Sequence, residues 1–227
     1  MDALFSTSFV EATPFGILAA VHLPPGLEDP PKAILRGLHP EEAAVAGTLR
    51  GRRRVEWVGG RLALREAAAG LGVELGAVLR GPRNEPLPPP AFSATVSHKR
   101  TLAVGLVAPA SEGTLGVDLE ELEPERMSIL QRILRPEEER RILELPEARR
   151  WGALVTRFAI KEAIYKALHP HVNRYVGFAE AEVELDDDVG EARVGLHLVR
   201  NEGPFVVEAR AERRSGFVLA QVRLRAG

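Results

Sequence analysis

Two carboxylates stand one residue apart at the end of an apolar run, in the segment GVDLE of residues 116–120. The run is typical of a β-strand, and because side chains alternate along a strand, Asp118 and Glu120 should share one face, opposite Val117. Two carboxylates on one face repel each other unless a cation lies between them, and hard oxygen ligands suit Mg²⁺ or Mn²⁺. The segment therefore predicts either a divalent-metal site or an acidic strand end beside the solvated acidic run that follows.

A second group of chemically useful residues lies on a predicted helix over residues 151–168. At about 100° per residue, Glu162 falls inside one apolar stripe of this helix. That stripe consists of Trp151, Leu154, Val155, Phe158 and Tyr165. A carboxylate on a buried face needs a partner, and Lys166 follows one turn later while Lys161 flanks the stripe. The alternative is an exposed Glu162–Lys166 pair in the favoured orientation, which does not explain a carboxylate among aromatic residues.

The two lysines of this helix belong to a chain that otherwise prefers arginine. Only four of the 30 Lys and Arg residues are Lys. A compact ammonium can do what a guanidinium fork cannot. The Lys pair therefore indicates that an ammonium group is needed at these two positions for its chemistry, unless the pair is an accident of composition.

Basic residues gather in the first half of the chain and could bind an anion. A run of arginines leads into a predicted helix over residues 55–71, and its members are Arg50, Arg52, Arg53 and Arg54. The helix carries Arg61, and Arg83 lies in a Pro-rich loop. Ser97 and His98 occupy a predicted hairpin turn, where backbone N–H groups and an imidazole can meet an anion. A solvated helix start and a nucleic-acid surface are the alternatives, but no aromatic residues interleave the run.

Composition excludes several classes of protein. The 227 residues are 45% apolar and 27% charged, with a net charge of −2 and no Cys, which is ordinary globular usage. Without Cys there is no disulfide scaffold, thiolate metal site or cysteine nucleophile. No apolar run approaches the ~18 residues of a membrane span, and the first residues lack the basic start of a signal peptide. We expect a soluble cytoplasmic protein with no general attraction to membranes or nucleic acid.

The pattern of elements predicts an α+β fold in two halves, residues 1–112 and 113–227. The first half should contain strands within residues 9–23, a helix from Pro40, the helix over residues 55–71, an extended Pro-rich loop over residues 80–90, and a hairpin of residues 92–96 and 102–107. The second half should contain a strand at 115–119, helices at 128–134, 136–145 and 147–168, and strands at 181–185, 194–199, 205–211 and 217–224. Each half thus reads as a strand, some helices and a hairpin, and a cleft between the halves is the default ligand site.

The two acidic motifs together resemble those of the Sfp-type 4′-phosphopantetheinyl transferases. That family carries a G-[IV]-D-[IV]-E strand followed by a [WF]-[ST]-x-K-E-[AS]-x-x-K helix, and this chain has GVDLE at residues 116–120 and FAIKEAIYKAL at residues 158–168. The YKAL ending and the VGF segment of residues 176–178 look closest to the siderophore and enterobactin synthetase branch. Ala159 and Thr95 depart from the family's usual residues, which affects fine substrate positioning and removes no acid or lysine.

The resemblance implies two pseudosymmetric α/β halves with coenzyme A in the cleft between them. The reaction would be attack of a carrier-protein serine hydroxyl on the β-phosphorus of coenzyme A, releasing 3′,5′-ADP. The carrier protein would be an acyl or peptidyl carrier of fatty acid, polyketide or nonribosomal peptide assembly. The internal duplication makes a monomer plausible.

The resemblance also assigns roles to individual residues. The ligands of Mg²⁺, or of Mn²⁺ in its place, would be Asp118, Glu120 and Glu162. Glu162 would be the general base for the serine, with a metal-bound water as the alternative, and Lys166 would stabilise the leaving phosphate. The phosphates of coenzyme A would be held by Arg54, Arg61, Arg83, Ser97 and His98, and contacts to coenzyme A would also come from Asp118, Lys161 and Lys166.

Two other classes of function stay open. A protein that retains coenzyme A without turnover should lack a metal ligand or a lysine, and none is missing. A nucleic-acid-binding module would use the Arg50–Arg54 run and should bind DNA with a steep salt dependence.

A segment just after the acidic strand could receive the carrier protein. Met127, Leu130 and Leu134 recur at helical spacing, and basic residues surround them, namely Arg126, Arg132 and Arg135. An apolar strip with a basic rim would complement an acidic carrier surface. A helix packed on its own core, with arginines reaching outward, is the alternative.

Overall fold

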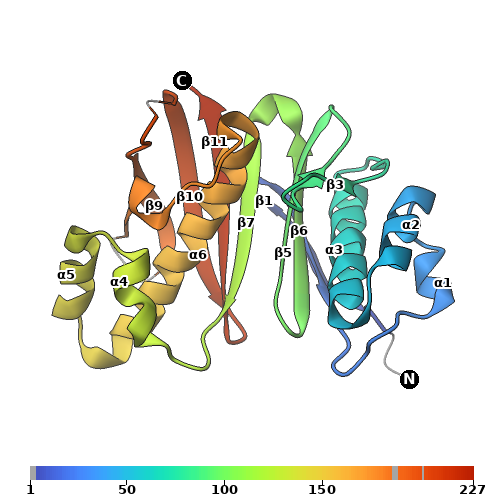
Figure 1. The fold of residues 1–227 in the computed structure, drawn as a ribbon, viewed down its shortest axis with the longest axis horizontal. Coiled ribbons are helices and arrows are strands. Elements are labelled where there is room, and N and C mark those ends of the chain that lie inside the picture. The colour runs from blue at the N-terminus through green and yellow to red at the C-terminus, as the bar shows by residue number, and fades with distance from the viewer. Residues whose placement is uncertain (1–3, 186–188, 201) are drawn as a thin grey trace. The chain divides into compact units, whose positions relative to one another are not determined.

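The computed structural model describes residues 4–185, 189–200 and 202–227. Its contacts divide the chain into two compact units, Met1–Glu112 and Gly113–Gly227, here called unit 1 and unit 2. Each unit combines a mainly antiparallel sheet with helices on one of its faces (Figure 1). The expected α+β class is confirmed.

Unit 1 is a four-stranded antiparallel sheet in the order β1-β2-β6-β5, with the long helix α3 against it. Its elements are β1 (Thr7–Thr13), β2 (Gly16–His22), α1 (Lys32–Leu35), α2 (Pro40–Thr48), α3 (Gly51–Gly70), β3 (Leu79–Arg80), β4 (Pro86–Leu87), β5 (Phe92–His98), β6 (Leu102–Pro109) and a 3₁₀ turn at Ala110–Glu112. Helix α3 comes close to β6 because Gly105 has no side chain. A Cβ there would lie 2.7 Å from the Leu64 nitrogen.

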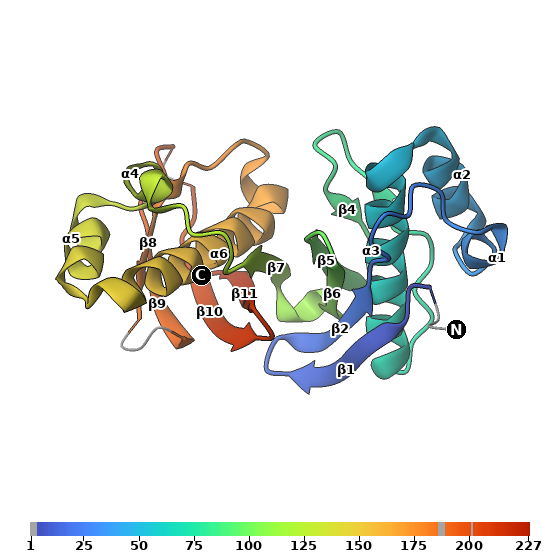
Figure 2. The same ribbon diagram turned by 90° about the horizontal axis from the view of Figure 1, so that it is seen from below.

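Unit 2 is a five-stranded antiparallel sheet in the order β7-β11-β10-β9-β8. Its elements are β7 (Thr114–Glu121), a 3₁₀ turn (Met127–Ile129), α4 (Leu130–Ile133), α5 (Pro136–Glu144), α6 (Glu147–Val172), a 3₁₀ turn η3 (Phe178–Glu180), β8 (Ala181–Glu184), β9 (Gly190–Leu196), β10 (Phe205–Arg214) and β11 (Phe217–Ala226). Helix α6 lies along one face of this sheet (Figure 2). Its buried side packs Ile160, Ile164 and Leu168 into a core shared with Val218 and Val222 of β11.

Two boundaries differ from those expected, and each moves candidate residues. Helix α3 begins at Gly51, earlier than residue 55, so the arginine run belongs to its first turns. Strand β5 continues to His98, because the Ser97 and His98 positions pair with β6 before the turn begins at Lys99. Ser97 and His98 are therefore strand residues, not turn residues. The Pro-rich loop contains a short antiparallel pairing of β3 with β4.

The two units repeat one local arrangement. The segments LHPEE of residues 38–42 and LRPEE of residues 134–138 open α2 and α5, and they stand 96 residues apart (134 minus 38). The segments RLALREA of residues 61–67 and RFAIKEA of residues 157–163 keep the same separation in α3 and α6. The last Glu of each opening segment, Glu42 or Glu138, binds a basic residue 23 positions later, Arg65 or Lys161. The repeat thus extends from sequence to side-chain contacts.

Candidate active site

The acidic strand and the lysine helix meet inside unit 2. Strand β7 and helix α6 are in direct backbone contact, since a Cβ on Gly116 would lie only 1.8 Å from the Ala163 carbonyl oxygen. Two positions further along β7, Asp118 is buried, and its Oδ1 lies 2.6 Å from the Nζ of Lys166. The same ammonium donates to the Val117 carbonyl at 2.8 Å. The two sequence motifs are therefore joined by an ion pair at one place.

Glu162 lies one turn before Lys166 on α6, but not on the side of the helix that we expected. The side that faces the sheet consists of small and aliphatic residues, including Ile160 and Ala163, which are buried. Glu162 and Tyr165 lie on the other side and are only partly buried. The expectation of a carboxylate inside the buried stripe was therefore wrong for this half of the helix. The partly buried position leaves Glu162 within reach of a ligand.

The carboxylates of β7 and α6 fit a divalent cation in their chemistry. Asp118 and Glu120 follow the alternation of one strand, and Glu162 belongs to the helix in contact with that strand, so the set offers hard oxygen donors. Among the described residues, however, no three His, Asp or Glu side chains are grouped closely enough to hold a metal ion. Here the Lys166 ammonium supplies the positive charge beside Asp118.

Lys161 does not reach a ligand site, which corrects the expected contact with coenzyme A. Its side chain is 1% exposed, and its Nζ donates to Glu138 Oε2 at 2.5 Å, to the Ile133 carbonyl at 2.9 Å and to the Phe178 carbonyl at 3.1 Å. An ammonium has three N–H donors, and all three are used. Burial lowers the pKa of Lys161, and the neighbouring Glu138 carboxylate opposes that shift. Lys161 is therefore an internal cation of unit 2.

Arg61 is also buried, in unit 1. Its side chain stacks over Trp57 at 3.7 Å, its Nε donates to the Val78 carbonyl at 2.6 Å, and its Nη2 donates to the Leu79 carbonyl at 3.1 Å. Burial lowers its pKa to about 10. These contacts fix the chain just before the Pro-rich loop that carries Arg83. Two of the five N–H groups of Arg61 therefore bind backbone carbonyls at the start of that loop and not the phosphate that we had expected.

The arginines at the start of α3 have unequal roles. Arg52 donates to the backbone carbonyls of Pro24, Lys99 and Arg100, and so ties α3 to the turn after β5. Arg54 pairs with Asp29. Arg52 also donates to Glu56 Oε1, one turn later on the helix, at 3.2 Å. Nothing in the residue pattern indicates its three backbone acceptors, which lie far along the chain.

Of the remaining expected phosphate ligands in unit 1, Arg83 and His98 are exposed, and Ser97 is buried beside His98 in the chain. Arg83 is exposed in a turn, where its backbone N–H donates to Glu85 Oε2 at 2.8 Å. The His98 side chain is 41% exposed, with Nδ1 3.8 Å from Glu56 Oε1. Its neighbour Ser97 is buried in β5.

The expected carrier-docking strip is not an exposed surface. Leu130 and Leu134 are buried in the core of unit 2, and Met127 is partly buried against it. Arg135 donates a hydrogen bond to the Ala179 carbonyl. Of the basic rim, Arg126 and Arg132 are exposed and Arg135 is partly buried. The helix packs on its own core, as in the alternative explanation.

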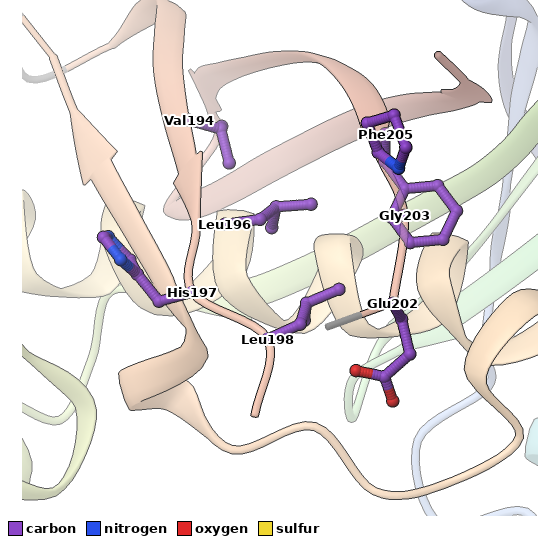
Figure 3. A pocket seen from close by; sticks show the side chains of 8 residues that line it. Val194, Leu196, His197, Leu198, Glu202, Gly203 and Phe205 are labelled. Atoms are coloured by element: carbon purple, nitrogen blue, oxygen red, sulfur yellow. The ribbon is translucent and has the colours of Figure 1, made fainter. Parts of the chain in front are cut away.

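A separate cavity of about 640 Å³ opens in unit 2 where β9 and β10 diverge. The two strands pair only between residues 190–192 and 209–211, so β9 continues along β8 alone. Figure 3 shows Val194, Leu196 and Leu198 facing this space together with Phe205. None of the expected site residues lines it.

The described helices include none that is both long enough and apolar enough to pass through a membrane. This finding concerns the described residues only.

Comparison with known proteins places the chain in one family. The model of the 4′-phosphopantetheinyl transferase superfamily matches residues 114–220, and that of the 4′-phosphopantetheinyl transferase N-terminal domain matches residues 40–108. The chain is 29% identical over 186 residues to the 4′-phosphopantetheinyl transferase PptT of Mycobacterium tuberculosis, covering 80% of this chain and 77% of that protein. It is 30% identical over 166 residues to the 4′-phosphopantetheinyl transferase Npt of Nocardia iowensis, covering 72% of this chain and 73% of that protein.

Solved structures give a partial match. A holo-(acyl-carrier-protein) synthase of Bacillus anthracis, solved in complex with coenzyme A (3′,5′-ADP), is 27% identical with a TM-score of 0.42, covering 50% of this chain and 96% of that one. The sequence comparisons carry the assignment, because the two family models match in order along both units and the Npt relative is matched over most of its length. The chain is a transferase and belongs to the 4′-phosphopantetheinyl transferase superfamily.

Proposed function

We propose that a carrier-protein serine hydroxyl attacks the β-phosphorus of coenzyme A on this enzyme. A bond forms between the serine oxygen and that phosphorus, and the bond from the phosphorus to the oxygen that bridges it to the adenosine half breaks. The 4′-phosphopantetheine group is thereby transferred to the carrier, and 3′,5′-ADP leaves with the bridging oxygen. The serine proton goes to a base on the enzyme.

One observation carries this proposal. The Lys166 ammonium binds both Asp118 and the Val117 carbonyl, which links the acidic strand to the lysine helix at the place where the family motifs converge. Two of its three N–H donors are used there, and the third is available to a phosphate oxygen. Because the side chain is 27% exposed, a ligand can reach it. Lys166 is thus suited to stabilise the leaving phosphate as a point charge.

Glu162 is the proposed general base. It lies one turn from Lys166 on the partly buried side of α6, so its carboxylate can accept the serine proton close to the cation that meets the phosphate. A positioned base typically contributes a rate factor of about 10²–10⁴.

A divalent cation, Mg²⁺ or Mn²⁺, would be held by Asp118, Glu120 and Glu162, whose carboxylates would have to come closer together than they lie in this structure. When bound, the cation would neutralise charge on the pyrophosphate of coenzyme A. Asp118 supplies a buried carboxylate from β7, and Glu162 supplies one from the adjoining helix. The preference of such cations for hard oxygen donors supports this assignment.

Unit 1 supplies the cations for the phosphates of coenzyme A. Arg83 and His98 are accessible, and Arg54 and Ser97 belong to the same unit. Arg61 acts through the backbone of residues 78–79, which leads into the Arg83 loop. We assign the direct phosphate contacts to the accessible pair, Arg83 and His98, and further contacts to Arg54 and Ser97.

The narrower assignment is to the siderophore and enterobactin synthetase branch of the family. Its support is the YKAL ending of the lysine helix and the VGF segment at residues 176–178. The acceptor is an acyl or peptidyl carrier protein of fatty acid, polyketide or nonribosomal peptide assembly. The proposal includes a cytoplasmic location, a monomeric state and a role in secondary metabolism.

The proposal is tested by intact-protein mass spectrometry. Apo carrier proteins of the three assembly types are incubated with the enzyme, coenzyme A and Mg²⁺, and in parallel with excess EDTA. We expect a mass gain of one phosphopantetheine group on at least one carrier, with an equal amount of 3′,5′-ADP released, and no gain in EDTA. No gain on any of the three types would contradict the transfer, and full transfer in EDTA would contradict the metal.

A further inference from the structure

The buried pair of Glu138 and Lys161 has no place in the reaction described above, yet its hydrogen bonding is complete. Glu138 Oε1 accepts from the Val183 backbone N–H at 2.8 Å. Its Oε2 accepts from the Arg135 backbone N–H at 2.7 Å and from Lys161 at 2.5 Å. The Glu138 side chain is 0% exposed. A buried pair remains stable only when such additional hydrogen bonds satisfy both partners.

The pair joins four segments of unit 2 at the residue next to Glu162. Lys161 holds the end of α4 through the Ile133 carbonyl and the 3₁₀ turn η3 through the Phe178 carbonyl. Glu138 holds the start of α5 and, through Val183, strand β8. Helix α6 can therefore neither rotate nor slide without breaking charge-assisted hydrogen bonds, which are about twice as strong as neutral ones.

Stability alone does not require a charged pair at this place. Replacing a buried ion pair by well-packed apolar residues of similar volume is often neutral or stabilising, whereas removing one partner costs about 3–5 kcal/mol. What the pair adds over an apolar contact is direction, since each donor and acceptor accepts only a narrow range of angles.

Unit 1 contains an equivalent pair, Glu42 and Arg65, which is not next to the proposed base. Glu42 Oε1 accepts from the Val78 N–H at 2.8 Å, and its Oε2 accepts from the His39 N–H at 3.1 Å and from Arg65 at 2.6 Å. Arg65 occupies in α3 the place that Lys161 occupies in α6. The protein thus carries its own control for the effect of such a pair on folding.

We propose that Glu138 is a positioning residue for phosphopantetheine transfer: through Lys161 it fixes the rotation and height of α6 and so the place of the Glu162 carboxylate. The inference rests on the proposed role of Glu162. Within the motif KE of residues 161–162, the lysine sets the geometry and the glutamate does the chemistry.

The test compares Glu138→Gln with Glu42→Gln, both assayed well below their melting temperatures. Both variants should melt at lower temperature, since Glu138→Gln leaves the buried Lys161 less compensated and Glu42→Gln leaves the partly buried Arg65 less compensated. Only Glu138→Gln should lower kcat, by about 10- to 100-fold, because a misplacement of about 1 Å can cost about 10² in rate. Calorimetry should show unchanged affinity for coenzyme A. A merely structural role would move the melting temperature and leave kcat of the folded enzyme intact.

A double variant, Glu138→Met with Lys161→Met, covers the case in which Glu138→Gln does not fold. It leaves no uncompensated charge, so it should fold, and it should still show the loss of kcat because nothing directs α6. A folded double variant with wild-type kcat would overturn the inference. Glu162→Gln is measured in parallel. If Glu162→Gln is inactive while the double variant is fully active, the positioning role of Glu138 is contradicted and the role of Glu162 stands. If Glu162→Gln is active, the proposed role of Glu162 as the base is contradicted.

Discussion

The contact between β7 and α6 can be disturbed by one methyl group. Gly116 lies where a Cβ would sit 1.8 Å from the Ala163 carbonyl oxygen, and real Cβ atoms essentially never come closer than 3.0 Å to such an atom. In Gly116→Ala the strand and the helix must therefore separate by at least 1.2 Å, the difference between these two distances. The atom in the way belongs to the backbone, so no side chain can swing aside.

Two effects should follow from this separation. Overpacking of a core typically costs about 1–3 kcal/mol, and roughly 4–8 °C of melting temperature accompanies each kcal/mol in a unit of about 100 residues. Because Ala163 adjoins Glu162 and α6 also carries Lys166, the reacting groups move with the helix. A shift of this size should cost about 10² in kcat.

Transfer is measured as the mass gain of an apo carrier protein, and stability by circular dichroism melting. Gly105→Ala is the matched control, since its Cβ would lie 2.7 Å from the Leu64 nitrogen on α3 and overlap by only 0.3 Å relative to 3.0 Å. It should lower the melting temperature less than Gly116→Ala and leave kcat nearly unchanged. A Gly116→Ala enzyme with wild-type melting temperature and kcat would show that this contact limits neither stability nor transfer.

Three further outcomes are expected. Arg174 hydrogen-bonds Glu180 and holds the pKa of that carboxyl group at about 2, below the usual 4.5, so the carboxylate stabilises the fold above about pH 4.5 and loses that effect as pH falls toward 2. Glu180→Gln should therefore lower the melting temperature at pH 7 and reduce the drop in melting temperature between pH 5 and 3. A drop as large as that of the wild type would contradict this. Arg61→Lys keeps the charge but loses the fork that holds the Val78 carbonyl, so the KM for coenzyme A should rise several-fold in steady-state kinetics, and an unchanged KM would argue against the loop-holding role. Gly47→Ala, in helix α2 with no atom within 4 Å of the new Cβ, should raise the free energy of unfolding by about 0.5–1 kcal/mol in urea titration, whereas destabilisation would show that the helix is strained there.

The elements that position the site could be predicted because their signals are local. Residues 115–119 alternate as a strand should, and Pro40 and Pro136 begin helices where a missing N–H costs nothing. The predicted start of the lysine helix at residue 147 is confirmed, although the helix continues past residue 168 to Val172. Such signals need no knowledge of distant contacts.

The orientation of Glu162 could not be predicted from a helical wheel. Helix α6 is buried around most of its circumference, so its apolar residues do not define one side. The side against the sheet is marked by small residues such as Ala159 and Ala163, which allow close approach, rather than by the large aromatic residues. Hydrophobicity alone does not separate these two kinds of burial.

The structural role of Lys161 depends on a partner 23 residues earlier in the chain, Glu138. A signal for it is present in the sequence, because LHPEE and LRPEE are followed at equal spacing by RLALREA and RFAIKEA. This internal repeat relates Lys161 to Arg65 through sequence alone. The backbone carbonyls that Arg61 and Arg52 bind, by contrast, are not indicated by any residue type.

The catalytic role of Glu162 is open to a single-turnover experiment. Wild-type enzyme, Glu162→Gln and Glu66→Gln, which changes the repeat counterpart of Glu162 on α3, are each mixed in excess with coenzyme A, Mg²⁺ and an apo carrier protein. We expect Glu162→Gln to bind coenzyme A measurably by calorimetry but to transfer at least about 10²-fold more slowly, while Glu66→Gln matches the wild type. Transfer by Glu162→Gln at the wild-type rate would contradict the assignment of Glu162 as the base.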